Sequence, residues 1–192
     1  MDDGAHFPAN PPKELKDFDI SFQPSIDPGT FRELQTLEWL KAGENVVLIG
    51  PPGVGKTHIA MGLGVEAVRH GYTVRFYLAA DLLKILNDAV HDGIFEEKLR
   101  EINKVKLLII DELGYLLYSV KEAHLLFQLI SKRYEKKSVI VTSNKTPSEW
   151  GLIFGDSTAA SAILDRLLHH CTPMLIQGDS WRIHEQTVKK IK

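Results

Sequence analysis

Short strand-like segments alternate with longer amphipathic segments from residue 45 onward. Three continuous apolar runs, at 46–49, 107–110 and 139–141, are typical of strands buried on both faces of a parallel sheet. Strands are also predicted at 74–78 and 174–176. Helices are predicted where apolar residues recur every three or four positions, at 57–69, 81–92 (with Asp81 as N-cap), 95–102, 121–136 and 159–170. This alternation predicts an α/β fold, with helices on both faces of a parallel sheet and ligands at the carboxyl ends of the strands.

The segments before residue 45 have a different character. Residues 1–17 are polar and rich in proline, so we expect a disordered or extended tail. Residues 18–26 carry apolar side chains at intervals of two or four and suit an arm that packs on the body of the protein. A helix is predicted over 28–42. We therefore expect four parts in the chain, namely the tail (1–17), the arm and helix (18–44), an α/β core (45–185) and a basic C-terminal tail (186–192).

The composition narrows the class of protein. With 192 residues, 44% hydrophobic and 25% charged, the chain suits one soluble globular domain. No apolar run approaches the ~18 residues of a membrane helix, and the start lacks the apolar segment of a secretory signal. Cys171 is the single cysteine, which excludes an internal disulfide, so we expect a cytoplasmic protein with no membrane partner. The net charge of −2 is unlike that of a dedicated DNA-binding domain, so DNA contacts must come from a local patch or from many subunits.

The sequence Gly50-Pro51-Pro52-Gly53-Val54-Gly55-Lys56-Thr57 fits the pattern G-x-x-x-x-G-K-[ST]. The glycines let the backbone curl so that successive N–H groups point at phosphate oxygens, and the following helix adds the positive end of its dipole. Lys56 can reach the β- and γ-phosphates of ATP, and the Thr57 hydroxyl can ligate Mg²⁺. The alternative is a glycine-rich turn with a solvated lysine. A predicted strand before the loop and a predicted helix after it favour the phosphate-binding loop.

Acidic and polar residues follow two other predicted strands. Asp111 and Glu112 directly follow the run 107–110, where Asp111 can hold the magnesium shell through Thr57 and water. Glu112 is then placed to polarise a water for attack on the γ-phosphate, which favours hydrolysis over phosphate transfer to a small molecule. Asn144 follows the fourth predicted strand and would face that water if its strand lies between the first and the third. The alternative for Asp111 and Glu112 is that they only cap the end of a strand. The alternative for Asn144 is that it only forms the turn after one.

Five motifs are distinctive when taken together. They are Phe18-Asp19-Ile20-Ser21-Phe22-Gln23-Pro24-Ser25-Ile26, the P-loop followed by His58, Asp111-Glu112-Leu113-Gly114-Tyr115, Leu164-Asp165-Arg166-Leu167-Leu168-His169-His170 and Gly178-Asp179-Ser180-Trp181-Arg182. Over residues 15–184 these motifs resemble the IstB-like transposition helper ATPases, although the last motif has tryptophan where the family more often has tyrosine. The P-loop alone indicates only a nucleoside triphosphatase, whereas the arm and the string at 164–170 are far more specific.

The resemblance implies an AAA+ ATPase of the helicase-loader clade, related to the DnaC replicative loaders. Such a protein has a three-layer core with a five-stranded parallel sheet and no helical lid domain. ATP and Mg²⁺ would be bound by residues 50–58 and Asp111, with Thr57 and Asp111 at the metal. The resemblance implies a catalytic set of Lys56, Glu112, Asn144 as polar sensor and Arg166 as arginine finger in a neighbouring subunit's site.

The resemblance also implies partners. The arm would flank the adenine, and helices within 81–103 would contact DNA. The partners would be further copies of the chain with shared active sites, DNA, and a transposase. Only about 17 residues precede the arm, so we expect a fragment or a shortened chain without the family's N-terminal partner domain. Only 26 residues follow Arg166, which leaves no room for a lid, and Arg182 is a candidate substitute for a lid-borne arginine.

Without the resemblance, some of these residues have simpler interpretations. Arg166 is typical of a surface ion-pair partner on an amphipathic helix. His169 and His170 lack ligand spacing and acidic companions in the sequence, so we expect structural or surface residues. The lysines and glutamates between 96 and 106 indicate a solvated helix face.

Four functions remain open from the sequence. The first is an ATP-hydrolysing helper that assembles on DNA and assists a transposase, favoured by the arm and the string at 164–170. The others are a DnaC-like replicative helicase loader, an ATP-dependent binding switch with negligible turnover, and a small-molecule kinase. The kinase would need a substrate pocket and a lid that the sequence does not indicate.

Overall fold

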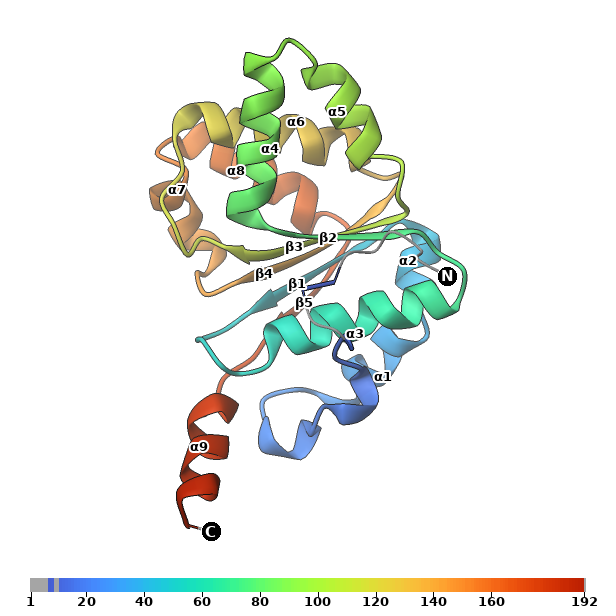
Figure 1. The fold of residues 1–192 in the computed structure, drawn as a ribbon, viewed down its shortest axis with the longest axis vertical. Coiled ribbons are helices and arrows are strands. Elements are labelled where there is room, and N and C mark those ends of the chain that lie inside the picture. The colour runs from blue at the N-terminus through green and yellow to red at the C-terminus, as the bar shows by residue number, and fades with distance from the viewer. Residues whose placement is uncertain (1–6, 9–10, 192) are drawn as a thin grey trace.

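The computed structural model describes residues 7–8 and 11–191 of the chain (Figure 1). Three 3-10 helices lie at Leu15–Asp17, Ile20–Phe22 and Pro147–Glu149. The strands are β1 (Asn45–Ile49), β2 (Val74–Leu78), β3 (Leu107–Leu113), β4 (Ser138–Ser143) and β5 (Cys171–Leu175). The α-helices are α1 (Pro28–Gln35), α2 (Glu38–Ala42), α3 (Lys56–Arg69), α4 (Ala79–His91), α5 (Phe95–Ile102), α6 (Val120–Arg133), α7 (Trp150–Ile153), α8 (Ser157–Leu168) and α9 (Trp181–Ile191).

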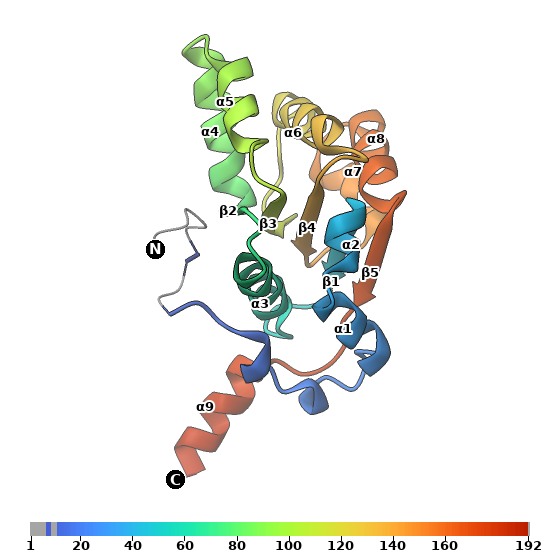
Figure 2. The same cartoon turned by 90° about the vertical axis from the view of Figure 1, so that its right-hand side faces the viewer.

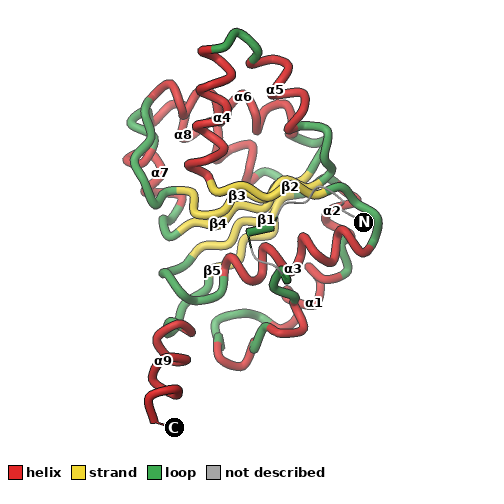
Figure 3. The backbone as a smooth tube through the Cα atoms, viewed as in Figure 1, coloured by secondary structure: helices red, strands yellow, loops and turns green. Residues whose placement is uncertain are grey.

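The five strands form one parallel sheet in the order β2-β3-β4-β1-β5. Helices α1 to α3 cover one face and α4 to α8 cover the other (Figures 1 and 2). Figure 3 shows the strands as a single twisted layer between them. Val47 and Ile49 pack into the core on the α4 to α8 side, whereas Val46 and Leu48 pack into the core on the α3 side. Both faces of the sheet are buried, which confirms the predicted three-layer α/β fold.

Two helices replace the single helix that we predicted over 28–42. Leu37 breaks the run with φ 59°, a left-handed conformation that costs a leucine ~1–2 kcal/mol. Leu37 is only 1% exposed, and the free energy gained by burying a leucine side chain is of similar size, so burial offsets the cost of this conformation. The apolar spacing continues through the break, so the helical pattern alone did not reveal it.

Other boundaries also differ from the prediction. Asp81 lies inside the first turn of α4, whose N-cap residue is Leu78, so the predicted cap at Asp81 is wrong. Strand β5 begins at Cys171, three residues before the predicted start. Helices α7 and α9 were not predicted, because the first is only four residues long and the second lies in a polar segment.

A buried arginine joins the amino ends of β3 and β4. Arg133, the last residue of α6, is 1% exposed. Its Nη2 donates hydrogen bonds to the carbonyl oxygens of Val105, Lys106 and Ser138, at 3.3, 3.0 and 2.9 Å. Desolvation lowers the pKa of Arg133 to about 9. One guanidinium thus satisfies three backbone carbonyls at the ends of two neighbouring strands.

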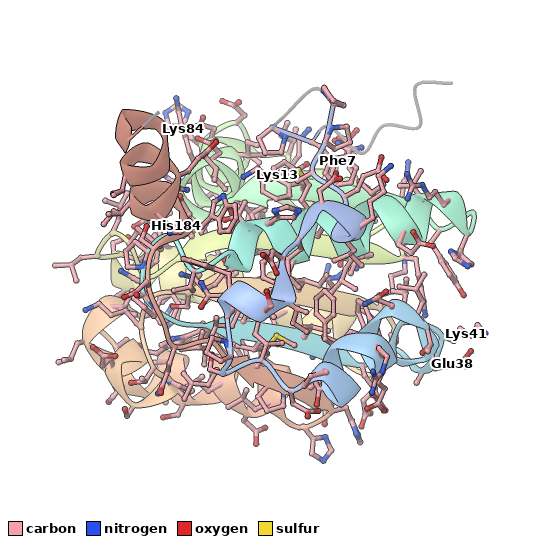
Figure 4. All side chains as sticks on the ribbon, turned by 90° about the horizontal axis from the view of Figure 1, so that it is seen from below. Phe7, Lys13, Glu38, Lys41, Lys84 and His184 are labelled. Atoms are coloured by element: carbon pink, nitrogen blue, oxygen red, sulfur yellow. The ribbon has the colours of Figure 1, made fainter. Side chains whose placement is uncertain are left out.

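The described parts of the N-terminal region pack on the α3 side of the sheet. Phe7 and Lys13 lie on the segment beside α3, and His184 of α9 lies far from Glu38 and Lys41 of α2 (Figure 4). Residues 1–6 and 9–10 of the predicted tail and Lys192 at the end lie outside the described residues. Within the described part of the chain, every helix is too short or too polar to cross a membrane.

Candidate functional site

The loop Gly50–Thr57 joins the carboxyl end of β1 to α3. Gly53 and Gly55 have φ of 86° and 98°, in the left-handed region that other residues rarely adopt. A Cβ on Gly53 would lie 2.1 Å from Ser180 Oγ, and a Cβ on Gly55 would lie 2.4 Å from the Phe18 ring. Both positions therefore require glycine, for the backbone conformation and for the close approach of two distant segments.

Lys56 begins α3 and folds back under its own loop. The residue is 5% exposed, and Nζ donates hydrogen bonds to the carbonyl oxygens of Gly50 and Pro51, both at 2.7 Å. Desolvation lowers the pKa of Lys56 to about 8, although the negative charge of Asp111 opposes the shift. The ammonium has two carbonyl acceptors but no carboxylate within ion-pair distance among the described residues. A phosphate bound to the loop would supply that missing counter-charge.

Asp111 forms a hydrogen-bonded group with two threonines. Thr57 Oγ1 lies 3.0 Å from each Asp111 carboxylate oxygen and donates to this carboxylate, and the Thr142 hydroxyl donates to Asp111 Oδ1. Asp111 is 2% exposed, so these donors offset part of the cost of burying it. The structure therefore brings Thr57 and Asp111 together, as predicted from their places after the first and third predicted strands, although β3 extends beyond its predicted end through Asp111 to Leu113.

Glu112 stands where the pairing of β3 with β4 becomes irregular. The register between the two strands shifts between Ile110 and Leu113, and Glu112 has φ 62°. Its N–H donates to Thr142 Oγ1 at 2.9 Å, and the residue lines a cavity beside the loop. Asp111 and Glu112 thus have different environments, one buried against Thr57 and the other open to the cavity.

Asn144 follows β4, which lies between β3 and β1 as our expectation for this residue required. Its Oδ1 is buried and has no hydrogen-bond partner among the described residues. Asn144 is not among the residues that line the cavity. This unpaired acceptor lies at the carboxyl end of β4, at the edge of the sheet that also carries the loop and Asp111.

The cavity has a volume of about 370 Å³, within the usual range for small-molecule sites. Its walls come from the arm, the loop with the start of α3, the end of β3, and the start of α9. Among the residues predicted to bind nucleotide, Pro52 to His58 line it, whereas Gly50, Pro51 and Asp111 do not. The lining residues are Lys13, Asp17, Phe18, Asp19, Phe22, Gln23, Pro52, Gly53, Val54, Gly55, Lys56, Thr57, His58, Glu112, Tyr115, Trp181, Arg182 and Glu185.

The arm contacts the segment 179–181, which leads into α9, beside the loop. The Phe22 and Trp181 rings pack edge to face, with centroids 4.9 Å apart at 89°. Gln23 Nε2 donates to the Asp179 carbonyl at 3.0 Å, and the Trp181 N–H donates to the Gly53 carbonyl at 3.0 Å. No role for Trp181 was predicted from the sequence. The only sequence signal for this residue was its place in the motif at 178–182. Its contact with Phe22 joins residues about 160 positions apart, so no local pattern predicts it.

Arg182, in the first turn of α9, also lines the cavity. Its positive charge is among the causes that lower the pKa of Lys56, after desolvation. The two cations are therefore close enough to interact at the loop. This is the end of the cavity at which phosphate groups would bind.

Arg166 lies away from this cavity. Its carbonyl accepts a hydrogen bond from Asn45 Nδ2 at 3.5 Å, at the amino end of β1, whereas the loop follows the carboxyl end roughly 13 Å further on. The guanidinium stacks on the Phe127 ring, 4.6 Å from its centroid, and Nη1 donates to the Ala162 carbonyl at 3.1 Å. It forms no ion pair with any described residue, so the surface ion pair that we considered is not found.

Comparison with known proteins places this loop and fold in a family. The family model described as IstB-like ATP binding protein matches residues 4–189. This chain belongs to the IstB-like ATP binding protein family. A relative from Geobacillus stearothermophilus, the inferred ATP-binding protein of insertion sequence IS5376, is 46% identical over 180 residues, which are 94% of this chain and 72% of the relative. The corresponding IS21 protein of Pseudomonas aeruginosa is 48% identical over 174 residues, 91% of this chain and 66% of the relative.

Solved structures share the fold of this IstB-like chain. The crystal structure of DnaI has a TM-score of 0.71 at 22% identity and covers 85% of this chain and 90% of that one. The DnaC helicase loader has a TM-score of 0.64 at 22% identity and covers 77% and 86%. At this level of identity the likeness shows the fold alone. It confirms the α/β core with a five-stranded parallel sheet that the resemblance implied.

Proposed function

We propose that this IstB-like chain binds ATP in the cavity beside residues 50–57. The observation that carries the proposal is the arrangement of a phosphate-binding loop, Lys56 and Glu112 around one cavity. Lys56 would exchange its carbonyl acceptors for phosphate oxygens. Phe18 and Phe22 of the arm would flank the adenine, and Arg182 would add a second cation at the phosphates.

We also propose that Mg²⁺ accompanies the nucleotide. Hydroxyl and carboxylate oxygens are ligands that Mg²⁺ prefers, and the contact between Thr57 and Asp111 provides both at the loop. Thr57 would bind the ion directly and Asp111 would hold its water shell, oriented by the hydrogen bond from Thr142. When bound, the ion supplies positive charge to the β- and γ-phosphate oxygens.

The same cavity supports hydrolysis. Glu112 presents a carboxylate to it, which would orient a water for in-line attack on the γ-phosphorus and accept its proton. The bond from phosphorus to the β–γ bridging oxygen breaks, and ADP and phosphate leave. Asn144 would contact that water through its side-chain oxygen, which has no hydrogen-bond partner among the described residues.

Arg166 would complete the site of a neighbouring subunit. It lies at the opposite end of β1 from its own loop, and its guanidinium rests on Phe127 without an ion-pair partner among the described residues. An arginine in this position cannot reach its own nucleotide but is available to another copy. We therefore propose a homo-oligomer with active sites between subunits, in which Arg166 stabilises negative charge in the transition state.

The biological role that we propose is an ATP-driven helper that assembles on DNA and assists a transposase. The support is the family and the relatives from insertion sequences, at 46% and 48% identity. A helicase loader is the second candidate, since DnaC and DnaI share the fold. We favour the transposition role because the sequence identity to the insertion-sequence relatives is about twice that to the loaders.

The deciding experiment measures ATP hydrolysis per subunit against protein concentration, with and without double-stranded DNA. A rate that rises with concentration, and further with DNA, is expected if active sites form between subunits on DNA. A flat rate near zero despite tight ATP binding would refute hydrolysis by this chain. The variant Glu112→Gln separates a motor from a switch, because it should abolish turnover and accumulate an ATP-bound assembly, whereas a switch would be unaffected.

A further inference from the structure

Three potential metal ligands meet far from the nucleotide cavity. Glu135 lies in the turn after α6, and His169 and His170 follow the last residue of α8. His170 Nε2 is 3.5 Å and His169 Nδ1 is 3.9 Å from Glu135 Oε1, and one ligand atom from each residue lies within 4.8 Å of the others. From the sequence we expected no acidic companion for the two histidines. The fold supplies one from 34 positions earlier in the chain.

These separations are close to those around a tetrahedral zinc ion. Zn–N and Zn–O distances of about 2.0–2.1 Å place neighbouring ligand atoms about 3.3 Å apart. The two distances from Glu135 Oε1 exceed this value by about 0.2 and about 0.6 Å, and all three ligand atoms lie within 4.8 Å of one another. The side chains are 52%, 49% and 54% exposed for His169, His170 and Glu135, so they are free to make that adjustment.

The position of Glu135 follows from the backbone. The turn after α6 gives it φ 56°, and the Lys136 N–H donates back to the Arg133 carbonyl at 3.0 Å. His170 is fixed on the other side, because its carbonyl accepts a hydrogen bond from the Asn45 N–H at 2.8 Å, at the start of β1. The ligands therefore come from two backbone segments that the core already holds in place.

Two residues next to this cluster, Cys171 and Tyr134, also carry side chains that can bind metal ions. Cys171 follows the histidines, but its side chain packs against the hydrophobic core. The Tyr134 hydroxyl forms a hydrogen bond with His169 Nδ1 at 2.5 Å. An ion bound at that nitrogen would replace the hydrogen bond and leave the hydroxyl beside the ion.

We propose that Glu135, His169 and His170 bind one divalent transition-metal ion, for which Zn²⁺ is the best match. Two imidazoles and one carboxylate suit Zn²⁺ and exclude Mg²⁺, which prefers an all-oxygen shell. The fourth position would hold a water. The ion would link the turn between α6 and β4 to the junction of α8 and β5. This proposal does not depend on ATP binding or hydrolysis.

The test is a titration of the metal-stripped, untagged full chain with Zn²⁺ by calorimetry, without nucleotide. We expect one Zn²⁺ per chain, and a higher melting temperature when it is bound. Bound Co²⁺ should give the intense visible absorption of a tetrahedral site. His170→Ala and Glu135→Gln should each weaken the site by more than about tenfold, and Mg²⁺ should not compete.

The matched control is His91→Ala. His91 is an exposed histidine whose Nδ1 lies 3.4 Å from Asp92 Oδ1, and it represents an ordinary surface pair of histidine and carboxylate. This variant should bind Zn²⁺ as the wild type does. Tyr134→Phe removes the group that competes for His169 Nδ1, so it should bind Zn²⁺ at least as tightly. Equal Zn²⁺ affinity in His170→Ala and the wild type, or no binding by the wild type, would overturn the proposal.

Discussion

Raising the pH above 8 should weaken ATP binding through Lys56. Desolvation lowers the pKa of this lysine to about 8, and its Nζ donates to two backbone carbonyls. A bound triphosphate would place negative charge beside the ammonium and raise its pKa, so ATP binds preferentially to the protonated form. Above pH 8 most of the free protein has lost this proton, and ATP binding must take one up from solution.

The size of the effect follows from that pKa. With a value of about 8 in the free protein and one well above 9 in the complex, binding should take up about 0.1 proton at pH 7, about 0.5 at pH 8 and about 0.9 at pH 9. The dissociation constant should then rise about tenfold between pH 7 and pH 9, which corresponds to ~1.4 kcal/mol. Calorimetry in two buffers with different ionisation enthalpies measures the proton uptake directly.

The control for this prediction is Lys56→Arg. A guanidinium stays charged throughout this range, so ATP should bind more weakly overall but without the loss of affinity between pH 7 and pH 9. A wild-type dissociation constant that stays constant from pH 7 to pH 9, with no proton uptake, would show that Lys56 remains charged in the free protein. The inference that it lacks a counter-charge before ATP binds would then be wrong.

Three further predictions concern other parts of the molecule. Arg166→Ala should leave ATP affinity within about twofold and lower turnover of the assembled protein by about 10³ or more, and a normal rate per subunit would contradict its role as a finger. Gly53→Ala should lower the melting temperature and weaken ATP binding more than Gly71→Ala does. Gly71 has a similar φ of 80° but open space around it, so equal losses in the two variants would show that the close approach of Ser180 is unimportant. Arg133→Ala should lower the free energy of unfolding by about 3 kcal/mol or more in chemical denaturation, because three strand-end carbonyls lose their donor, and a loss below about 1 kcal/mol would refute that account.

The sequence alone determined the parts of this protein that depend on neighbouring residues. Continuous apolar runs such as 46–49 indicated strands buried on both faces, because every side chain of such a strand meets a covering helix. The P-loop pattern placed Lys56 and Thr57 at the start of a helix, and the run 107–110 placed Asp111 at the same edge of the sheet. Each inference needed only local periodicity and the rule that parallel strands end at one edge.

Only the tertiary structure decided which distant segments meet. The arm and the start of α9 meet at the cavity through the contact between Phe22 and Trp181. Neither motif, taken by itself, predicts that it will contact the other. The break at Leu37 depends on a core that is assembled from several helices, and Glu135 meets His170 only because a turn and a helix end lie side by side. The local pattern specifies the elements and the chemistry that each can carry. The contacts between them depend on how those elements pack, which residue spacing within one segment does not encode.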